Sequence, residues 1–302
     1  MKRIIILFFT LILCTVSKAQ WQTDYGFSIG ISNYLGDIGG KEKTRRDFLA
    51  DLKFAKTRWN VGGFYRHKLS QKFFVKIAAD YLRIEGDDKL STNPARNARN
   101  LNFRNDMVEV SGTFQFLIFE DNDLGNTYRY KNGFRAFVFA GLGGFYSNPK
   151  ALYKGSYVPL RPLKTEGVTY SPLGINIPVG IGFYFTMSKK HRIGFDVNYR
   201  FTFTDYLDDI SGNYPDSASI SGNPALSYRT PELGKPANKQ EASVYHSHGW
   251  GQKRGDKTHN DGYITMNLSY SYVLRGKSSF YKSKYRRGGG GGGRSRKIRA
   301  KF

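Results

Sequence analysis

Cysteine is nearly absent from this sequence, whose 302 residues include only Cys14. If the chain is cleaved after Ala19, the mature protein contains no cysteine at all. Disulfide bonds and thiol catalysis are then excluded. Attachment of a lipid to Cys14 is the less favoured alternative, because the preceding Leu13 is bulkier than such sites usually accept.

Long apolar runs are also scarce. Residues 4–16 form an apolar run, which follows two basic residues and precedes a cleavage-site pattern that ends at Ala19. A membrane-spanning helix needs about 20 apolar residues, and no later stretch reaches that length. Together these features predict a secretory signal peptide over residues 1–19.

Patterns that would indicate cofactor chemistry are weak. No glycine-rich loop follows a strand and opens a helix, so no nucleotide site is predicted. His246, His248 and His259 lack a nearby acidic or cysteine ligand, and we interpret them as solvated loop residues. Residues 203–214, "FTDYLDDISGNY", lack the regular spacing of a calcium loop, and their aspartates are expected to accept backbone hydrogen bonds where a strand ends. We therefore expect no catalytic, cofactor or metal site, and predict that the chain is not an enzyme.

Apolar and polar residues alternate with a period of two in many segments of the chain. The clearest segments are 193–203 and 264–274. Such alternation is typical of strands with one apolar and one polar face. Weaker versions occur at 25–34, 59–69, 73–84, 107–119, 134–146 and 173–187.

The polar face of these strands decides which side meets water. In 264–274 the polar set consists of small Thr, Asn and Ser side chains, which suit a narrow lumen better than an exposed surface. An apolar exterior and a polar interior are typical of an outer-membrane barrel. The residues expected to face lipid are Ile193, Phe195, Val197, Tyr199 and Phe201. Those expected in the lumen are Asp196, Asn198 and Arg200.

Long and short connections alternate along the chain, as in outer-membrane barrels, which have short periplasmic turns and long external loops. The shorter connections are 70–72, 120–133 and 188–191, and the long ones are 35–58, 85–106, 147–172 and 204–262. The fold predicted is all-β, a transmembrane barrel of eight antiparallel strands over residues 20–274, with both termini in the periplasm. Ten strands is the alternative, because 147–172 or 204–262 has room for another hairpin.

The end of the chain carries much of the formal net charge of +23. Residues 275–302 contain eleven Lys and Arg, no acidic residue, and a run of six glycines. Behind a signal peptide this segment meets the periplasm, so a flexible basic tail is predicted rather than a nucleic-acid-binding one. A solvated tail that ends in an aromatic assembly signal, Phe302, is the alternative to a docking tail. The candidate partner-binding residues are Arg286, Arg287, Arg294, Arg296, Lys297 and Arg299.

Five segments carry a resemblance to a known family. They are "SNYLGDIGG" (32–40), "RNLNFRNDMVEVSG" (99–112), "AGLGGFYSNPKA" (140–151), "RPLKTEG" (161–167) and "FTDYLDDISGNY" (203–214). In order and spacing the chain resembles the PorG family of outer-membrane barrels, components of the type IX secretion system. The resemblance covers about 25–274 and implies a role in protein secretion and gliding. It also implies two partners in a periplasmic ring, a PorK/GldK-like lipoprotein and a PorN/GldN-like protein.

An eight-stranded barrel has an interior that side chains just fill, which is too narrow for folded cargo. We therefore expect an anchor that tethers the periplasmic ring to outer-membrane lipid. The alternative is a small porin or an adhesin-like barrel that acts through its external loops.

Overall fold

A computed structural model describes residues 22–38, 54–91, 93–120, 133–188, 190–216, 218, 220 and 223–275. The predicted signal peptide at 1–19, most of the connection 120–133, and nearly all of the basic tail with its six candidate partner-binding residues lie outside this range. The fold described below is that of the unit Thr23–Val273.

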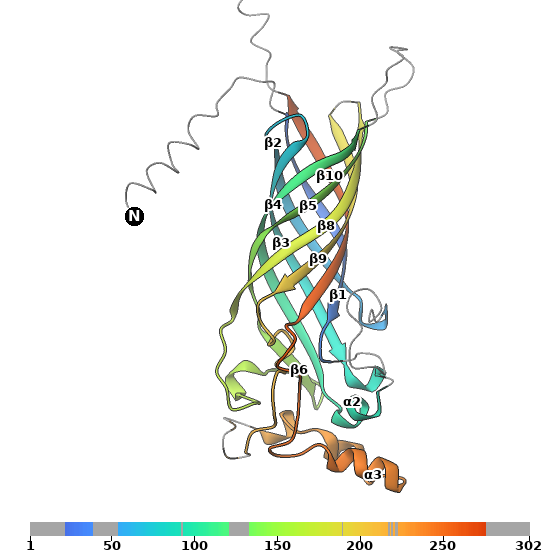
Figure 1. Cartoon of the computed structure of the whole chain (residues 1–302), viewed down its shortest axis with the longest axis vertical. Coiled ribbons are helices and arrows are strands. Elements are labelled where there is room, and N and C mark those ends of the chain that lie inside the picture. The colour runs from blue at the N-terminus through green and yellow to red at the C-terminus, as the bar shows by residue number, and fades with distance from the viewer. Residues whose placement is uncertain are drawn as a thin grey trace, which may run out of the picture. The chain divides into compact units, whose positions relative to one another are not determined.

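Strands dominate the chain (Figure 1). They are β1 (Gln22–Leu35), β2 (Arg58–Lys68), β3 (Phe73–Asp87), β4 (Asn102–Glu120), β5 (Phe134–Tyr146), β6 (Pro149–Tyr153), β7 (Ser156–Pro159), β8 (Leu173–Met187), β9 (His191–Thr202) and β10 (Gly262–Arg275). The α-helices are α2 (Pro94–Arg99) and α3 (Lys239–His246), with short 3-10 turns at Phe54–Lys56, Asp88–Leu90, Arg161–Leu163, Pro224–Leu226 and Thr230–Leu233. In the described part of the chain, no helix is long and apolar enough to cross a membrane.

The strands form one sheet that closes on itself. The sheet has ten strands in the order β3-β2-β1-β10-β9-β8-β5-β4-β6-β7, and an additional pairing of β3 with β4 closes the ring. Because β6 and β7 lie outside that ring, eight antiparallel strands form the barrel wall, as predicted. The further hairpin considered for 147–172 exists as β6 and β7, but it pairs with β4 only at Arg104 and Asn105, beyond the end of β5, instead of joining the wall. Closure leaves no open edge in the wall, the condition for a sheet in lipid.

Neighbouring strands are in a register that keeps inward and outward side chains aligned. Val197 of β9 is opposite Met266 of β10, and Asn198 is opposite Thr265. The ladder between β5 and β8 has no pairs at Ile177 and Pro178, yet its register is the same on both sides of this gap. Proline has no amide hydrogen, which explains the local interruption.

Two strands are longer than the sequence alternation indicates. β3 continues to Asp87 and β4 begins at Asn102, so the connection predicted at 85–106 is shorter than expected. In the added segments the outward residues are polar or charged, and Asp106 of β4 forms an ion pair with Arg83 of β3. The alternation of apolar and polar residues therefore stops before the strands do. Figure 1 shows β6, α2 and α3 gathered at the end of the barrel where the long connections lie; we call this the loop end and the other the turn end.

Apolar side chains fill both ends of the barrel interior. At the loop end, residues from the strands pack with Leu207 and Ile210 of the loop after β9, and both loop residues are 0% exposed. At the turn end a second buried cluster consists of Phe74, Leu117, Phe137, Phe139 and Tyr184. Polar groups occupy the space between these clusters.

Candidate functional site: a filled lumen under an ordered loop cap

The residues predicted for β9 lie on opposite faces of the strand. Asp196, Asn198 and Arg200 are buried inside the barrel. On the outer face, Ile193 and Phe201 are exposed, whereas Phe195, Val197 and Tyr199 are half-buried against their neighbours.

The centre of the lumen holds a carboxylate that several donors share. Glu109 accepts from Nε of Arg200 at 2.9 and 2.7 Å, and from the hydroxyl of Tyr263 at 2.5 Å. Asn176 donates to Glu109 at 3.2 Å and to the Tyr263 hydroxyl at 2.9 Å. Arg200 also donates to Thr265 Oγ1 at 2.5 Å. A buried guanidinium and carboxylate are tolerated when each has such partners.

Further charged groups surround this centre. Lys76 Nζ lies 3.8 Å from Asp196 Oδ1, and Arg200 Nη2 lies 3.9 Å from Asp80 Oδ2. Asn267 donates to Asp196 at 2.9 Å. Asp196 and Arg200 therefore belong to neighbouring ion pairs in one polar layer, and each has partners on other strands.

A second ion-pair group lies nearer the turn end. Asp24 accepts from Nη2 of Arg66 at 2.6 Å, from Nη1 of Arg192 at 2.6 Å, and from Ser271 at 2.8 Å. The two guanidinium groups lie 4.4 and 4.8 Å from the ring centroid of Tyr184. Sequence analysis missed this group because Asp24 and Arg192 lie one residue outside the segments that alternate. Extending the period of two by one residue would have placed both inside the barrel.

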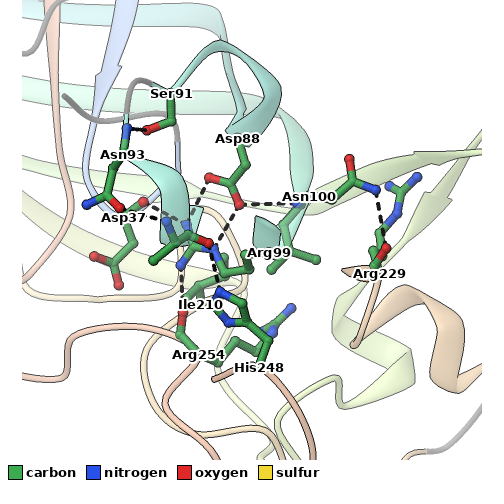
Figure 2. A network of polar contacts seen from close by, with 12 residues as sticks. Asp37, Asp88, Ser91, Asn93, Arg99, Asn100, Ile210, Arg229, His248 and Arg254 are labelled. Atoms are coloured by element: carbon green, nitrogen blue, oxygen red, sulfur yellow. Dashed lines mark hydrogen bonds and ion pairs between the residues drawn. The ribbon is translucent and has the colours of Figure 1, made fainter. Parts of the chain in front are cut away.

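The loop end is covered by an ordered cap formed by the long connections. Figure 2 shows Arg99 at its centre. This buried arginine donates to Asp88 at 2.8 and 2.9 Å, to the carbonyl of Arg254 at 2.6 Å, and to the carbonyl of Asp37 at 2.8 Å. Asp88 also accepts from the amide of Leu101 at 3.1 Å. One side chain thus joins three connections that are distant in the sequence.

The segment after β9 lies across the interior of the loop end. The carbonyl of Leu207 accepts from Asn105 Nδ2 at 2.8 Å, and its amide donates to Asp261 at 2.9 Å. Asp208 accepts from the amide of Ile210 at 2.9 Å, which is the strand-end role expected for an aspartate in this segment. The segment is therefore part of the barrel's core and not an exposed external loop.

Another buried group fixes the same segment from the opposite side. Glu166 accepts from the amides of Ser211 and Gly212 at 3.0 and 2.9 Å, and from Arg254 at 3.0 Å. Asp209 accepts from Tyr170 at 2.5 Å. All five segments that carry the family resemblance contribute to this cap or to the core beneath it. Their contributions are Tyr34, Asp37, Arg99, Asn105, Phe145, Ser147, Glu166, Leu207 and Ile210.

The aspartates of the cap have raised pKa values. Burial, together with the nearby Asp37, Glu166 and Asp256, raises the pKa of Asp205 to about 8. Burial also raises the pKa of Asp209 to about 6, although Arg254 opposes the shift. Burial and neighbouring carboxylates raise the pKa of Asp208 and of Asp261. The cap thus concentrates acidic groups that hold protons more tightly than exposed ones.

The histidines and aspartates considered as metal ligands are not assembled into a site. His248 contacts the carbonyl of Ala95 at 2.7 Å, whereas His259 lies 3.3 Å from Asp256. Over the described ranges, no group of three or more His, Cys, Asp or Glu side chains is arranged to hold a metal ion.

The outer surface of the barrel is apolar and has aromatic side chains near both ends. At the turn end, Phe73 packs against Phe116 with ring centroids 5.1 Å apart. Near the loop end, the rings of Trp59 and Tyr81 are 5.4 Å apart. Exposed aliphatic side chains lie between them, including Ile29, Val61, Ile77, Val110, Ile181 and Leu268.

Comparison with known proteins gives a family and a set of similar folds. A family model described as "Domain of unknown function (DUF6089)" matches residues 2–222, and the chain belongs to this family. No curated protein matches the sequence.

Among solved structures, the chain is similar to Ail, the attachment invasion locus protein of Yersinia pestis, in its complex with the heparin analogue sucrose octasulfate. The identity is 12% and the TM-score is 0.36, and the match covers 83% of this chain and 99% of Ail. It is similar to Neisserial surface protein A, with 6% identity, a TM-score of 0.36 and coverage of 85% and 98%. It is also similar to the outer membrane protein OprG from Pseudomonas aeruginosa, with 11% identity, a TM-score of 0.36 and coverage of 87% and 99%. Similarities this low assign no function to the chain.

Proposed function

We propose that this DUF6089 protein is an outer-membrane barrel that works as a membrane anchor and not as a conduit. The observation that carries the proposal is the filled lumen, in which the Glu109–Arg200 layer lies between two apolar clusters. A solute would have to break buried ion pairs to pass, and leaving such a charge unpaired costs about 3 to 5 kcal/mol. An anchor needs no open lumen, so the filled interior is compatible with this role.

The location in the outer membrane is supported by the barrel's exterior. Large apolar residues exposed on every wall strand would aggregate in water, because contiguous apolar patches of this extent are rare on soluble proteins. A closed wall, an apolar belt and aromatic residues near both of its edges are the features of transmembrane barrels.

For the partner, we propose the type IX secretion machinery, with a PorK/GldK-like lipoprotein and a PorN/GldN-like ring protein on the periplasmic side. This part of the proposal rests on the resemblance of the five segments named above. With even strand number and short turns in the periplasm, both chain ends would face that ring. The basic residues of 275–302 would then be available to an acidic face of the partner.

A second candidate is an adhesin-like barrel that acts through its external loops. The ordered cap around Arg99 favours it over a small porin, because a fixed surface loses less conformational entropy on binding than a mobile loop. Anchor and adhesin differ in the side of the membrane on which their partner lies.

Affinity purification from detergent-extracted membranes, followed by mass spectrometry, tests the proposal. The anchor predicts co-purification of periplasmic ring proteins, and truncation after Gly276 should reduce their recovery more strongly at low salt, because high salt already screens the charges of the tail. Recovery of no periplasmic protein would contradict the anchor. Stable ion conductance of the purified barrel in a planar bilayer would contradict a closed lumen.

A further inference from the structure

The outer face of the barrel changes from apolar to charged at the same level on neighbouring strands. On β3, outward residues are apolar from Phe73 to Tyr81, and the next outward residue is Arg83. On β4, Val108 pairs with Tyr81, and Asp106 pairs with Arg83. The Arg83 guanidinium lies 5.6 Å from the ring centroid of Trp59 on β2. A row of charges therefore begins directly beyond the aromatic residues at the loop end.

The charged row has more cations than anions. Its cations are Lys56, Arg58, Arg83, Arg104 and Lys150. Its anions are Glu85, Asp87 and Asp106. We call these eight residues the ionic band. Five positive and three negative side chains leave an excess of two positive charges.

The excess is concentrated around Asp106, which lies near three cations. Arg83 Nε is 2.6 Å from Asp106, whereas Arg104 Nη2 and Lys150 Nζ are 3.4 and 3.8 Å away. Arg104 Nε is buried and has no hydrogen-bond partner among the described residues. The Arg104 guanidinium also lies 4.8 Å from the ring centroid of Tyr157 on β7, which holds it in place. Arg104 and Lys150 are paired residues of β4 and β6, and neither makes a side-chain hydrogen bond among the described contacts, so their outer N–H groups can donate to a ligand.

The ionic band is confined to one side of the barrel. At the loop end of β8 the outward residues are Leu173 and Ile175, and both are exposed and apolar. Phe201 and Phe203, at the same end of β9, are exposed as well. A general boundary between lipid and water would be charged all around the barrel. Among the described residues, the band lies on the 3-10 turn before β2 and on β2, β3, β4 and β6, which indicates a local binding surface.

The depth of the band matches that of a lipid headgroup. The outward stretch from Phe73 to Tyr81 covers roughly 20 Å of the membrane normal, at about 3.3 Å per residue and a tilt near 40°. The apolar band of an outer membrane is about 25 Å tall. The next outward residues, Arg83 and Asp106, then lie at its edge. Arginine donors at this depth suit phosphate oxygens, which accept paired, charge-assisted hydrogen bonds.

We propose that the ionic band binds a phosphorylated lipid of the leaflet at the loop end, with Arg104 and Lys150 contacting its phosphate groups. The proposal rests on the proposed membrane location, and its ligand class is a glycolipid that carries two phosphates. The two excess positive charges match such a headgroup, and the apolar residues beneath the band would contact its acyl chains.

The test uses the full-length protein purified in a neutral detergent, with native mass spectrometry as the readout of bound lipid. The probes are bisphosphorylated lipid A, phosphatidylcholine and inorganic phosphate. Arg104→Gln/Lys150→Gln removes the two excess cations and leaves Arg83–Asp106, Arg58–Glu85 and Lys56–Asp87 as one-to-one pairs. We expect this double variant to bind lipid A about tenfold more weakly, while phosphatidylcholine binding stays unchanged.

Lys235→Gln/Lys239→Gln is the matched control, because it removes the same charge from exposed positions of the cap. It should bind lipid A like the natural sequence. Heat-modifiable migration on gels checks that both variants are folded, and Arg104→Lys should retain most of the binding. Equal affinity of the double variant and the natural sequence would overturn the proposal. So would displacement of lipid A by millimolar inorganic phosphate, which would indicate a site for free phosphate. Absence of the natural protein from the outer-membrane fraction would instead contradict the proposed function.

Discussion

The hydroxyl oxygen of Tyr34 lies 2.7 Å from Oδ2 of Asp208, which belongs to the segment that crosses the loop end. The same oxygen lies 2.5 Å from Oδ1 of Asp261 and accepts a hydrogen bond from the amide of Asp37 at 3.0 Å. A phenol has one hydrogen and donates to only one carboxylate. The other carboxyl group must therefore carry a proton and donate it to Tyr34. This count of donors agrees with the raised pKa values of Asp208 and Asp261.

The shared proton predicts that the cap loosens at high pH. A carboxyl group with a raised pKa in the folded state contributes stability that is fully present below its unfolded pKa and is lost as the pH rises through its folded pKa. Because the pKa is about 6 for Asp209 and about 8 for Asp205, this loss of stability extends from about pH 6 to about pH 8. Amide hydrogen exchange of residues 204–212, corrected for intrinsic rates, should be faster at pH 8.5 than at pH 5.5.

Asp208→Asn tests the origin of this pH dependence, because asparagine keeps the shape of the side chain but does not ionise. Other charged groups near Asp208 are Asp37, Asp205 and Arg99. We expect the variant to have a smaller difference in exchange between the two pH values. An unchanged difference would assign the effect to the other carboxyl groups.

Arg99→Ala should release the cap without unfolding the barrel. The substitution leaves Asp88 buried without its ion-pair partner and frees the carbonyls of Asp37 and Arg254. Breaking such a pair costs about 3 to 5 kcal/mol. Limited trypsin digestion should then cut within residues 223–260 at least tenfold faster, while heat-modifiable migration persists. The control is Arg96→Gln. Arg96 lies one helical turn away in α2 and has no buried ion pair among the described contacts. Equal protection of the Ala variant and the natural sequence would show that the cap does not depend on Arg99.

Glu109→Gln should destabilise the barrel more than the double substitution Glu109→Gln/Arg200→Met. The single change leaves the buried Arg200 guanidinium without its carboxylate, a loss of about 3 to 5 kcal/mol, whereas the double change removes both charges. Urea titration of folding into lipid vesicles measures the free energies for a double-mutant cycle. Additive losses would mean that the two side chains do not interact.

Val197→Arg should destabilise the barrel by about 2 to 4 kcal/mol, because it places a charge on the outward face near the middle of β9. Asn198→Ser changes the next residue, whose side chain points into the lumen, and should have little effect. Folding yield in vesicles at increasing urea distinguishes the two. Comparable losses would contradict an apolar environment around Val197, and recovery of the natural protein as a soluble periplasmic species would contradict membrane insertion.

Sequence alone determined the wall of the barrel. Strands such as 193–203 alternate apolar and polar residues, and the period of two assigns each side chain to a face before any contact is known. The alternation of short and long connections then favours eight strands, and only the structure excluded ten by placing β6 and β7 outside the wall. Both alternations are local properties of the chain, so they can be read without a tertiary structure.

The tertiary structure decided how the interior and the cap are built. The sequence predicts that Arg200 and Glu109 both lie in the lumen, but it does not indicate their exact pairing, that Asp24 bridges Arg66 and Arg192, or that Leu207 lies in the core. These contacts join residues up to 168 positions apart, as between Asp24 and Arg192, and depend on the stagger with which the ring closes. The segment "FTDYLDDISGNY" shows the same limit, since the sequence predicts only that its aspartates accept backbone hydrogen bonds where a strand ends. The segment is buried because Tyr34 contacts Asp208, Arg254 donates to the carbonyl of Asp209, and Glu166 accepts from the amide of Ser211, contacts that form only after the strands have closed.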